Sequence, residues 1–191
     1  MDTSILDYLR LFFSEGLSLK DKFLALERAG SIYQLFHGDL PTNKAEKSQV
    51  LKLRKLVNRP LYQNRAEQEY DLCNQNQIQI CTYENEDYPD HLKHCSDAPI
   101  LFFYRGNISI LKTPSISIVG TRRSDIYGKR VTESICKGLK EFKPNIVSGF
   151  ARGIDTYAHE SALAEGCKTT AVIATGFSKP YPSENLQLMS K

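Results

Sequence analysis

IVSGFARGIDTYAH, residues 146–159, predicts a buried strand, a turn flanked by glycines and the first turns of a helix. Gly149 and Gly153 would let the backbone come close to a ligand, and the first turn of the helix offers N–H groups that have no partner within the helix. Arg152 adds a fixed positive charge beside them. The stretch therefore predicts an anion site, for which a phosphate group is the natural ligand.

A second segment, SISIVGTRRSDIYG at residues 115–128, repeats this design with a β-rich run, a glycine turn with two arginines and a helical pattern. A further strand is predicted at 169–173. Strands that alternate with helices indicate parallel pairing. Because parallel strands end at one edge of the sheet, we expect the two turns to present their donors side by side.

Three motifs then resemble a known family: VGTRRSDIYG at 119–128, SGFARGIDTYAH at 148–159 and TGFSKPYPSEN at 175–185. In residues, order and spacing they are similar to successive motifs of the DNA-processing protein A family, also called DprA or Smf. The upstream segments YPDHL at 88–92 and APILFFYRG at 98–106 resemble that family's approach to its Rossmann-like domain. The resemblance thus extends over essentially the whole chain.

The resemblance implies an α/β fold in which a small helical domain of the sterile-alpha-motif (SAM) type, residues 1–62, precedes an extended Rossmann-like domain, residues 71–191. Family members continue further, so the chain is expected to be C-terminally truncated and its sheet incomplete. The implied function is to bind single-stranded DNA, protect incoming DNA and help load the recombinase RecA in natural transformation and recombination. The resemblance implies neither catalysis nor a cofactor, and it implies a homodimer only where the missing segment is present.

The first 60 residues show helical patterns. Ser4 and Ser18 are expected to cap two helices, the second of which ends near Gly30, and a third helix is expected over 45–57. The polar stretch 58–64 is the expected domain junction. Basic side chains crowd the polar side of the third helix and its end, with Glu46 as the acidic residue among them: Lys44, Lys47, Lys52, Arg54, Lys55 and Arg59.

Composition limits the classes of function. The 191 residues include 25 basic and 22 acidic ones, a net charge of only +3, so a nucleic-acid site must arise from local clustering of charge. The five cysteines lack metal-ligand spacing, the N-terminus lacks the pattern of a secretory signal, and the apolar runs are too short to cross a bilayer. We expect a cytoplasmic protein with no membrane contact and no metal.

Arg122 is the foremost candidate for a DNA contact, because a guanidinium grips phosphate in bidentate fashion or stacks on a base. The alternative is a solvated surface arginine. The resemblance assigns a DNA contact to the arginine of this Gly-Thr-Arg turn, and it also suggests the loop lysine Lys179. Phe150 either faces a base or packs under its turn. The candidate DNA-binding residues are Arg122, Arg123, Ser148, Gly149, Phe150, Arg152, Gly153, Lys179 and Asn185.

Other chemistries fit the sequence less well. Asp155 and His159 lie four residues apart on one helix face, which suits a base with an orienting carboxylate, but no Ser or Cys nucleophile in a sharp elbow accompanies them. A role in holding the turn is therefore favoured. His91, His94 and Cys95 lack a fourth metal ligand at suitable spacing.

The main rival is a nucleotide-hydrolysing enzyme of a related Rossmann-like family, the phosphoribohydrolases. The Pro-Gly-Gly-x-Gly-Thr motif of that family is missing from the sequence, as are Walker A and Gly-x-Gly-x-x-Gly motifs. A non-functional fragment is a further alternative.

Overall fold

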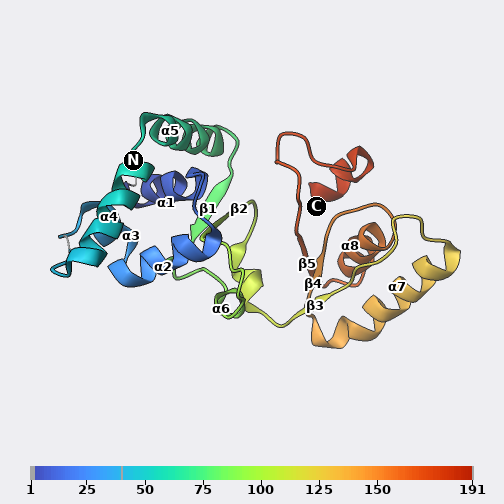
Figure 1. Ribbon diagram of the computed structural model, residues 1–191. Helices are drawn as coiled ribbons and strands as arrows, with labels where there is room; N and C mark the ends of the chain where they lie inside the picture. Colours follow the sequence, from blue (N-terminus) through green and yellow to red (C-terminus); the bar gives the residue numbers. More distant parts are fainter. Residues whose placement is uncertain (1–2, 40, 191) are drawn as a thin grey trace. The chain divides into compact units, whose positions relative to one another are not determined.

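The computed structural model describes residues 3–39 and 41–190 and divides into two compact units, Met1–Ile108 and Ser109–Lys191 (Figure 1). The first unit is mainly helical, with one small antiparallel sheet. The second has helices and a parallel sheet. Each unit has its own buried hydrophobic cluster, so each is described by itself.

The described part of the first unit contains a two-stranded antiparallel sheet, in which Gln79 pairs with Tyr104 and Thr82 with Leu101. Its elements are, in chain order, α1 (Thr3–Phe13), α2 (Leu19–Ala29), α3 (Ile32–His37), α4 (Lys44–Val57), α5 (Pro60–Gln75), β1 (Gln79–Thr82), α6 (Asp90–Lys93) and β2 (Leu101–Tyr104), and the 3₁₀ turn η1 (Ile108–Lys112) follows them.

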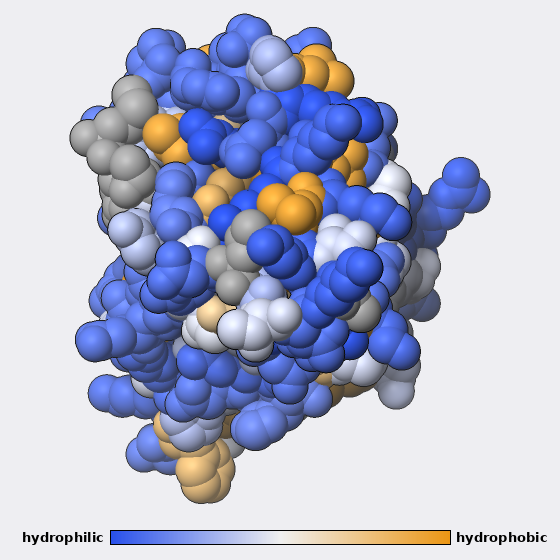
Figure 2. Space-filling model, turned by 60° about the vertical axis from the view of Figure 1, so that its left-hand side comes forward, coloured by the Kyte–Doolittle hydropathy of each residue, from blue (hydrophilic) through white to orange (hydrophobic). Residues whose placement is uncertain are grey.

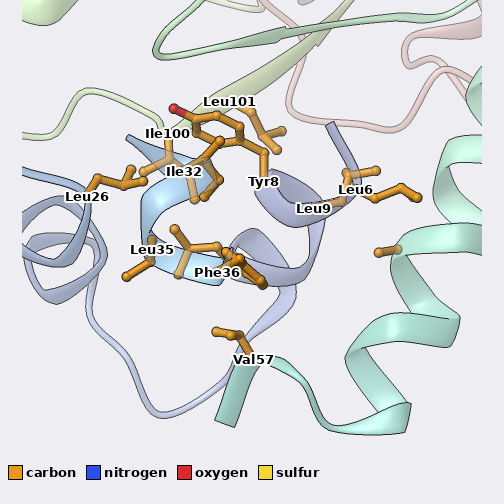
Figure 3. Close-up of a cluster of buried hydrophobic side chains, with 12 residues drawn as sticks. Leu6, Tyr8, Leu9, Leu26, Ile32, Leu35, Phe36, Val57, Ile100 and Leu101 are labelled. Atoms are coloured by element: carbon orange, nitrogen blue, oxygen red, sulfur yellow. The ribbon is translucent and has the colours of Figure 1, made fainter. Parts of the chain in front are cut away.

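The core of the first unit joins its helices to its sheet (Figure 3). Leu9 of α1, Leu35 of α3 and Val57 at the end of α4 have no exposed surface. Ile100 and Leu101, at the start of β2, belong to the same cluster. Because burial of such side chains from water is the main favourable contribution to folding, these contacts hold the β1–β2 sheet on the helical bundle.

The division of the chain differs from the sequence-based one. The helix α5 begins with Pro60 in its first turn. It runs through most of the polar stretch 58–64, the expected domain junction, and through residues 62–71, between the two expected domains. The structure instead divides between Ile108 and Ser109. The strands β1 and β2 lie within residues 71–191, which are expected to form the Rossmann-like domain, but they pair with each other and pack in the first unit.

Local helix signals are partly confirmed. Ser18 forms a capping box with Asp21, and Gly30 ends α2 in the left-handed conformation with φ of 83°. Ser4 lies within α1 and not before it, so the expected N-cap is wrong. The short helix α3 and the long helix α5 were not predicted.

The second unit contains a three-stranded parallel sheet in the order β3-β4-β5, which confirms the predicted α/β class. The central strand of this sheet is β4. In a doubly wound sheet the first strand would be expected in the centre. Its elements are β3 (Ser115–Ser117), α7 (Ile126–Leu139), η2 (Lys140–Phe142), β4 (Asn145–Ser148), α8 (Ile154–Ala164), β5 (Lys168–Ala171), η3 (Ser183–Asn185) and α9 (Leu186–Met189).

Small and branched side chains bring α8 close to the sheet. Ile146 of β4 and Ala158 and Ala162 of α8 are fully buried in one cluster. Asn145 is also fully buried, and its side chain donates to Ser115 Oγ over 3.3 Å and accepts from Thr170 Oγ1 over 2.9 Å. This amide therefore links all three strands, from the first residues of β3 and β4 to the third residue of β5.

All five cysteines are free thiols, and four of them are buried. Over residues 3–39 and 41–190, no helix is long and apolar enough to cross a bilayer. In the same ranges no three His, Cys, Asp or Glu side chains gather as a metal site would require.

Candidate nucleic-acid interface

Three connections meet at the edge of the sheet where β3, β4 and β5 end (Figure 1). They are residues 118–125, which lead into α7, residues 149–153, which lead into α8, and residues 172–182, which lead into η3. Because all three strands run in the same direction, their carboxyl ends share one edge. The motifs singled out in the sequence are therefore neighbours in space.

Glycine lets the first two turns touch each other. Gly153 has φ of 80°, and a Cβ atom at this position would lie 2.3 Å from the carbonyl oxygen of Thr121 and 3.1 Å from Cα of Arg122. The N–H of Ile154 donates to the same Thr121 oxygen over 3.2 Å. Gly120 has no room for a Cβ either, since that atom would lie 2.6 Å from Cγ1 of Ile154.

The carboxylate of Asp155 connects the same two turns from inside. Asp155 is buried, and its oxygens accept from the N–H of Gly120 over 3.4 Å and from the N–H of Ala151 over 3.3 Å. A Cβ at Gly149 would lie 2.8 Å from this carboxylate. Gly149 and Gly153 thus make room for protein groups and not, as expected from the sequence, for a ligand.

Three predicted contact residues have buried side chains. Ser148 donates to the carbonyl oxygen of Ile118 over 2.6 Å. Phe150 has φ of 62°, is 2% exposed and packs its ring 5.7 Å from that of His159. Asn185 donates to the carbonyl oxygen of Phe150 over 3.1 Å. These side chains hold the turns together and do not face solvent, and Phe150 packs under its turn.

Several of the exposed side chains at this edge are positively charged. Arg122, Arg123 and Lys179 are exposed, and none of their side chains forms a hydrogen bond or ion pair within the described part of the chain. Arg122 lies directly against Gly153, which is next to Arg152. The contact between the two turns therefore brings the backbone at Arg122 close to the backbone next to Arg152.

Arg152 joins the second turn to the third connection. Its guanidinium forms an ion pair with Glu184 over 2.6 Å and lies over the ring of Tyr181, 5.4 Å from the centroid. Hydrogen bonding to its own backbone and the Arg152 charge both lower the pKa of the Glu184 carboxyl, and desolvation opposes them. Tyr181 is half exposed and presents an aromatic surface beside the arginines.

Tyr181 and Glu184 were missing from the predicted site residues. Tyr181 lies in the loop motif at 175–185, and its aromatic side chain could have marked it as a candidate site residue. No pattern in the sequence relates Glu184 to Arg152, because the two residues lie 32 positions apart. Their pairing depends on how the third loop folds back over the second turn.

His159 lies beneath the turns as a neutral side chain. Its Nδ1 is 2.6 Å from Oγ1 of Thr169, which donates to the carbonyl oxygen of Ile146, so Nδ1 carries the hydrogen. Nε2 is buried and has no partner among the described residues. Burial lowers the pKa of His159 below its ordinary 6.5, while the charge of Asp155 acts in the opposite direction.

We expect this histidine to make the second unit less stable in acid. The unfolded chain takes up the proton at a higher pH than the folded chain, so stability is present above about pH 6.5 and is lost as the pH falls below it. Hydrogen exchange of β4 and β5 amides, corrected for intrinsic rates, should show protection falling from about pH 7.5 to about pH 5.5. His159→Gln should reduce this fall, whereas the exposed-site variant His91→Gln should keep it. An equal fall in wild type and His159→Gln would contradict the assignment.

The comparisons with known proteins agree with this architecture. Residues 79–191 match the family model described as DNA recombination-mediator protein A. The DNA processing protein DprA of Streptococcus pneumoniae is 46% identical over 101 residues, which cover 53% of this chain and 36% of that protein. The corresponding protein of Bacillus subtilis is 41% identical over 112 residues, or 58% of this chain and 38% of that protein. The matched stretch thus spans little more than a third of these relatives.

Solved structures extend the likeness to both units. The X-ray structure of DprA from Streptococcus pneumoniae superposes with a TM-score of 0.72 at 29% identity, over 96% of this chain and 63% of that one. A structure of DNA processing protein A from Helicobacter pylori, described as revealing its single-stranded DNA binding mode, superposes with a TM-score of 0.50 at 32% identity, over 58% of this chain and 50% of that one. On this match of sequence and fold, the chain belongs to the DNA recombination-mediator protein A family.

Proposed function

We propose that the chain binds single-stranded DNA at the carboxyl edge of its parallel sheet, without strong sequence preference. The observation that supports this most is the grouping of Arg122, Arg123 and Arg152 on two turns that touch each other, with Lys179 on the third connection. Lysine and arginine bind the phosphates that every DNA sequence shares. Arg122, Arg123 and Lys179 have no side-chain partner among the described residues and are free to do so.

Single-stranded DNA fits this edge better than a duplex. Tyr181 and the guanidinium planes offer surfaces on which unpaired bases stack, whereas paired bases are already stacked on one another. The ion pair with Glu184 positions Arg152 before DNA arrives. A phosphate that binds Arg152 has to compete with Glu184. The single-stranded DNA binding mode described for the Helicobacter pylori relative supports the same choice.

The proposed role is to protect incoming single strands and to hand them to RecA in the cytoplasm, during natural transformation and recombination. The family relationship supports this role. The role requires binding and no catalysis. Asp155 and His159, the orienting carboxylate and base that a hydrolase could use at this turn, are buried and engaged with protein groups, which disfavours a hydrolase site there.

Fluorescence anisotropy with labelled oligothymidine tests the proposal. The full chain should bind at low salt, and the logarithm of its binding constant should fall with the logarithm of salt concentration with a slope of about −2 or steeper, as for three or more phosphate contacts. An unlabelled single strand should compete better than a duplex of the same length. Folded protein that leaves the anisotropy unchanged at low salt would refute the proposal.

A further inference from the structure

The helix α4 exposes a row of lysines on the first unit. Lys44, Lys47, Lys52 and Lys55, here called the lysine row, line a shallow groove of about 380 Å³ together with Ser48 and Leu51. At about 3.6 residues per turn and about 1.5 Å per residue, these positions lie within an arc of about 140° and extend over about 16 Å. The row is therefore one continuous face.

The opposite side of α4 is occupied by the protein. Val57 is fully buried, and Leu53 packs against the core of the first unit. Arg54 also points inward, because its guanidinium donates to the carbonyl oxygens of Leu35 over 2.7 Å and Gly38 over 2.6 Å. The basic residues of this helix thus separate into a structural arginine and the exposed lysine row.

None of the row's ammonium groups forms an ion pair or hydrogen bond within residues 3–39 and 41–190. Glu46, the acidic residue of α4, lies about 200° around the helix from Lys44. The view that brings this side of the molecule forward shows mostly hydrophilic side chains, interrupted by small hydrophobic patches (Figure 2). The charge of the row is therefore open to solvent and to a partner.

The arrangement runs against the local preferences of a helix. Lys44 and Lys47 lie in the first turn, where the helix dipole favours acidic side chains. The pairs Lys44 and Lys47, and Lys52 and Lys55, place like charges three residues apart, which is unfavourable. The helix dipole favours Lys55 in the last turn, but the other charges of the row do not stabilise α4, so an anionic partner accounts for them better.

We propose that the lysine row is a second DNA contact, which binds the sugar-phosphate backbone of a single strand. This inference rests on the proposed function. Lysines are point charges on flexible stems, so a row about 16 Å long can follow successive phosphates of an irregular strand. The half-exposed Leu51 between them offers an apolar surface to sugars or bases.

A membrane surface fits the row less well. Helices that lie on membranes bury a broad apolar face in the lipid and carry cations around it. In α4 the apolar residues Leu53 and Val57 are committed to the core, and Leu51 is the exposed apolar residue of the row. The face therefore matches a polyanion such as DNA and not a lipid bilayer.

The test compares two fourfold variants of the full chain that lose the same charge. The row variant combines Lys44→Gln, Lys47→Gln, Lys52→Gln and Lys55→Gln, and the control combines substitutions to glutamine at four other exposed lysines, namely Lys20, Lys137, Lys143 and Lys168. Binding to a labelled oligothymidine of about 30 nucleotides is measured across a salt series. Circular dichroism of both variants should match the wild type.

The row variant should bind at least about 10-fold more weakly at about 0.1 M salt, and its salt slope should be shallower by about 2 to 3, as expected when four phosphate contacts are lost from a single strand. The control should stay within about 2-fold of the wild type, because general electrostatics contribute less than direct contacts. Equal effects of the two variants would overturn the inference in favour of diffuse attraction.

Arg122→Ala in the same assay separates the two proposals. A row variant that binds like the control, while Arg122→Ala is weakened, overturns the lysine row and leaves the carboxyl edge in place. A wild-type chain that does not bind overturns both. Wild-type binding to anionic phosphatidylglycerol vesicles that the row variant loses, with DNA binding unchanged, overturns the row as a DNA contact and assigns it to a membrane surface.

Discussion

Replacing Gly153 by alanine is expected to destabilise the second unit by about 3 kcal/mol, and to weaken DNA binding as well. Gly153 has φ of 80° and ψ of −127°, a conformation that residues with a Cβ rarely adopt. The added methyl group would also lie 2.3 Å from the carbonyl oxygen of Thr121, so the first two turns would have to separate. Arg122, whose backbone lies against Gly153, would move with them.

Gly166→Ala is the matched control for this variant. Gly166 also has positive φ, 71°, but a Cβ there would meet no atom within 4 Å, so the substitution should cost only the backbone strain, about 1 kcal/mol. Native-state hydrogen exchange of amides in β4 measures both losses without assuming that the two units unfold together. Equal losses in the two variants would show that contact between the turns contributes nothing.

Replacing Arg122 by alanine is expected to weaken binding to oligothymidine by about 1.5 to 3 kcal/mol, or roughly 10- to 150-fold. The guanidinium is exposed, has no protein partner within the described residues and stands beside the second turn, so its removal costs a charge-assisted hydrogen bond to phosphate without disturbing the fold. Fluorescence anisotropy at fixed salt measures the loss.

Two further variants show whether this loss depends on position and geometry. Lys137→Ala removes an exposed charge from the last turn of α7, near the edge where the strands begin, and should change binding by less than about 2-fold. Arg122→Lys keeps the charge but not the bidentate geometry, and should be intermediate. If Lys137→Ala weakened DNA binding as much as Arg122→Ala does, binding would depend on the net charge of the protein alone.

The α/β part of the fold could be predicted because its signals are local. The runs 115–117 and 145–148 are followed directly by glycine turns and helical patterns, and all of these elements exist. The helix α5 was missed because its buried residues Tyr62, Ala66 and Cys73 form a thin stripe among polar ones. That the β1–β2 sheet joins the first unit depends on long-range packing, which no local pattern contains.

The site could be predicted in its location and less well in its details. Arg122, Arg123 and Lys179 are exposed, since arginine and lysine are rarely buried without partners. The direction of Phe150 could not be predicted, because it depends on a left-handed backbone conformation that phenylalanine seldom adopts. The glycines were recognised as points of close approach, but the approaching group is the neighbouring turn.

Hydrogen exchange of the full chain with and without oligothymidine tests the central claim most directly, because it locates the bound strand on the protein. In the second unit, DNA should slow exchange in the three connections, at residues 119–123, 149–153 and 176–182, and should leave residues 137–144 at the opposite edge unchanged. Unchanged exchange in the three connections, with protection confined to residues 137–144, would contradict the assignment of the carboxyl edge as the DNA-binding site.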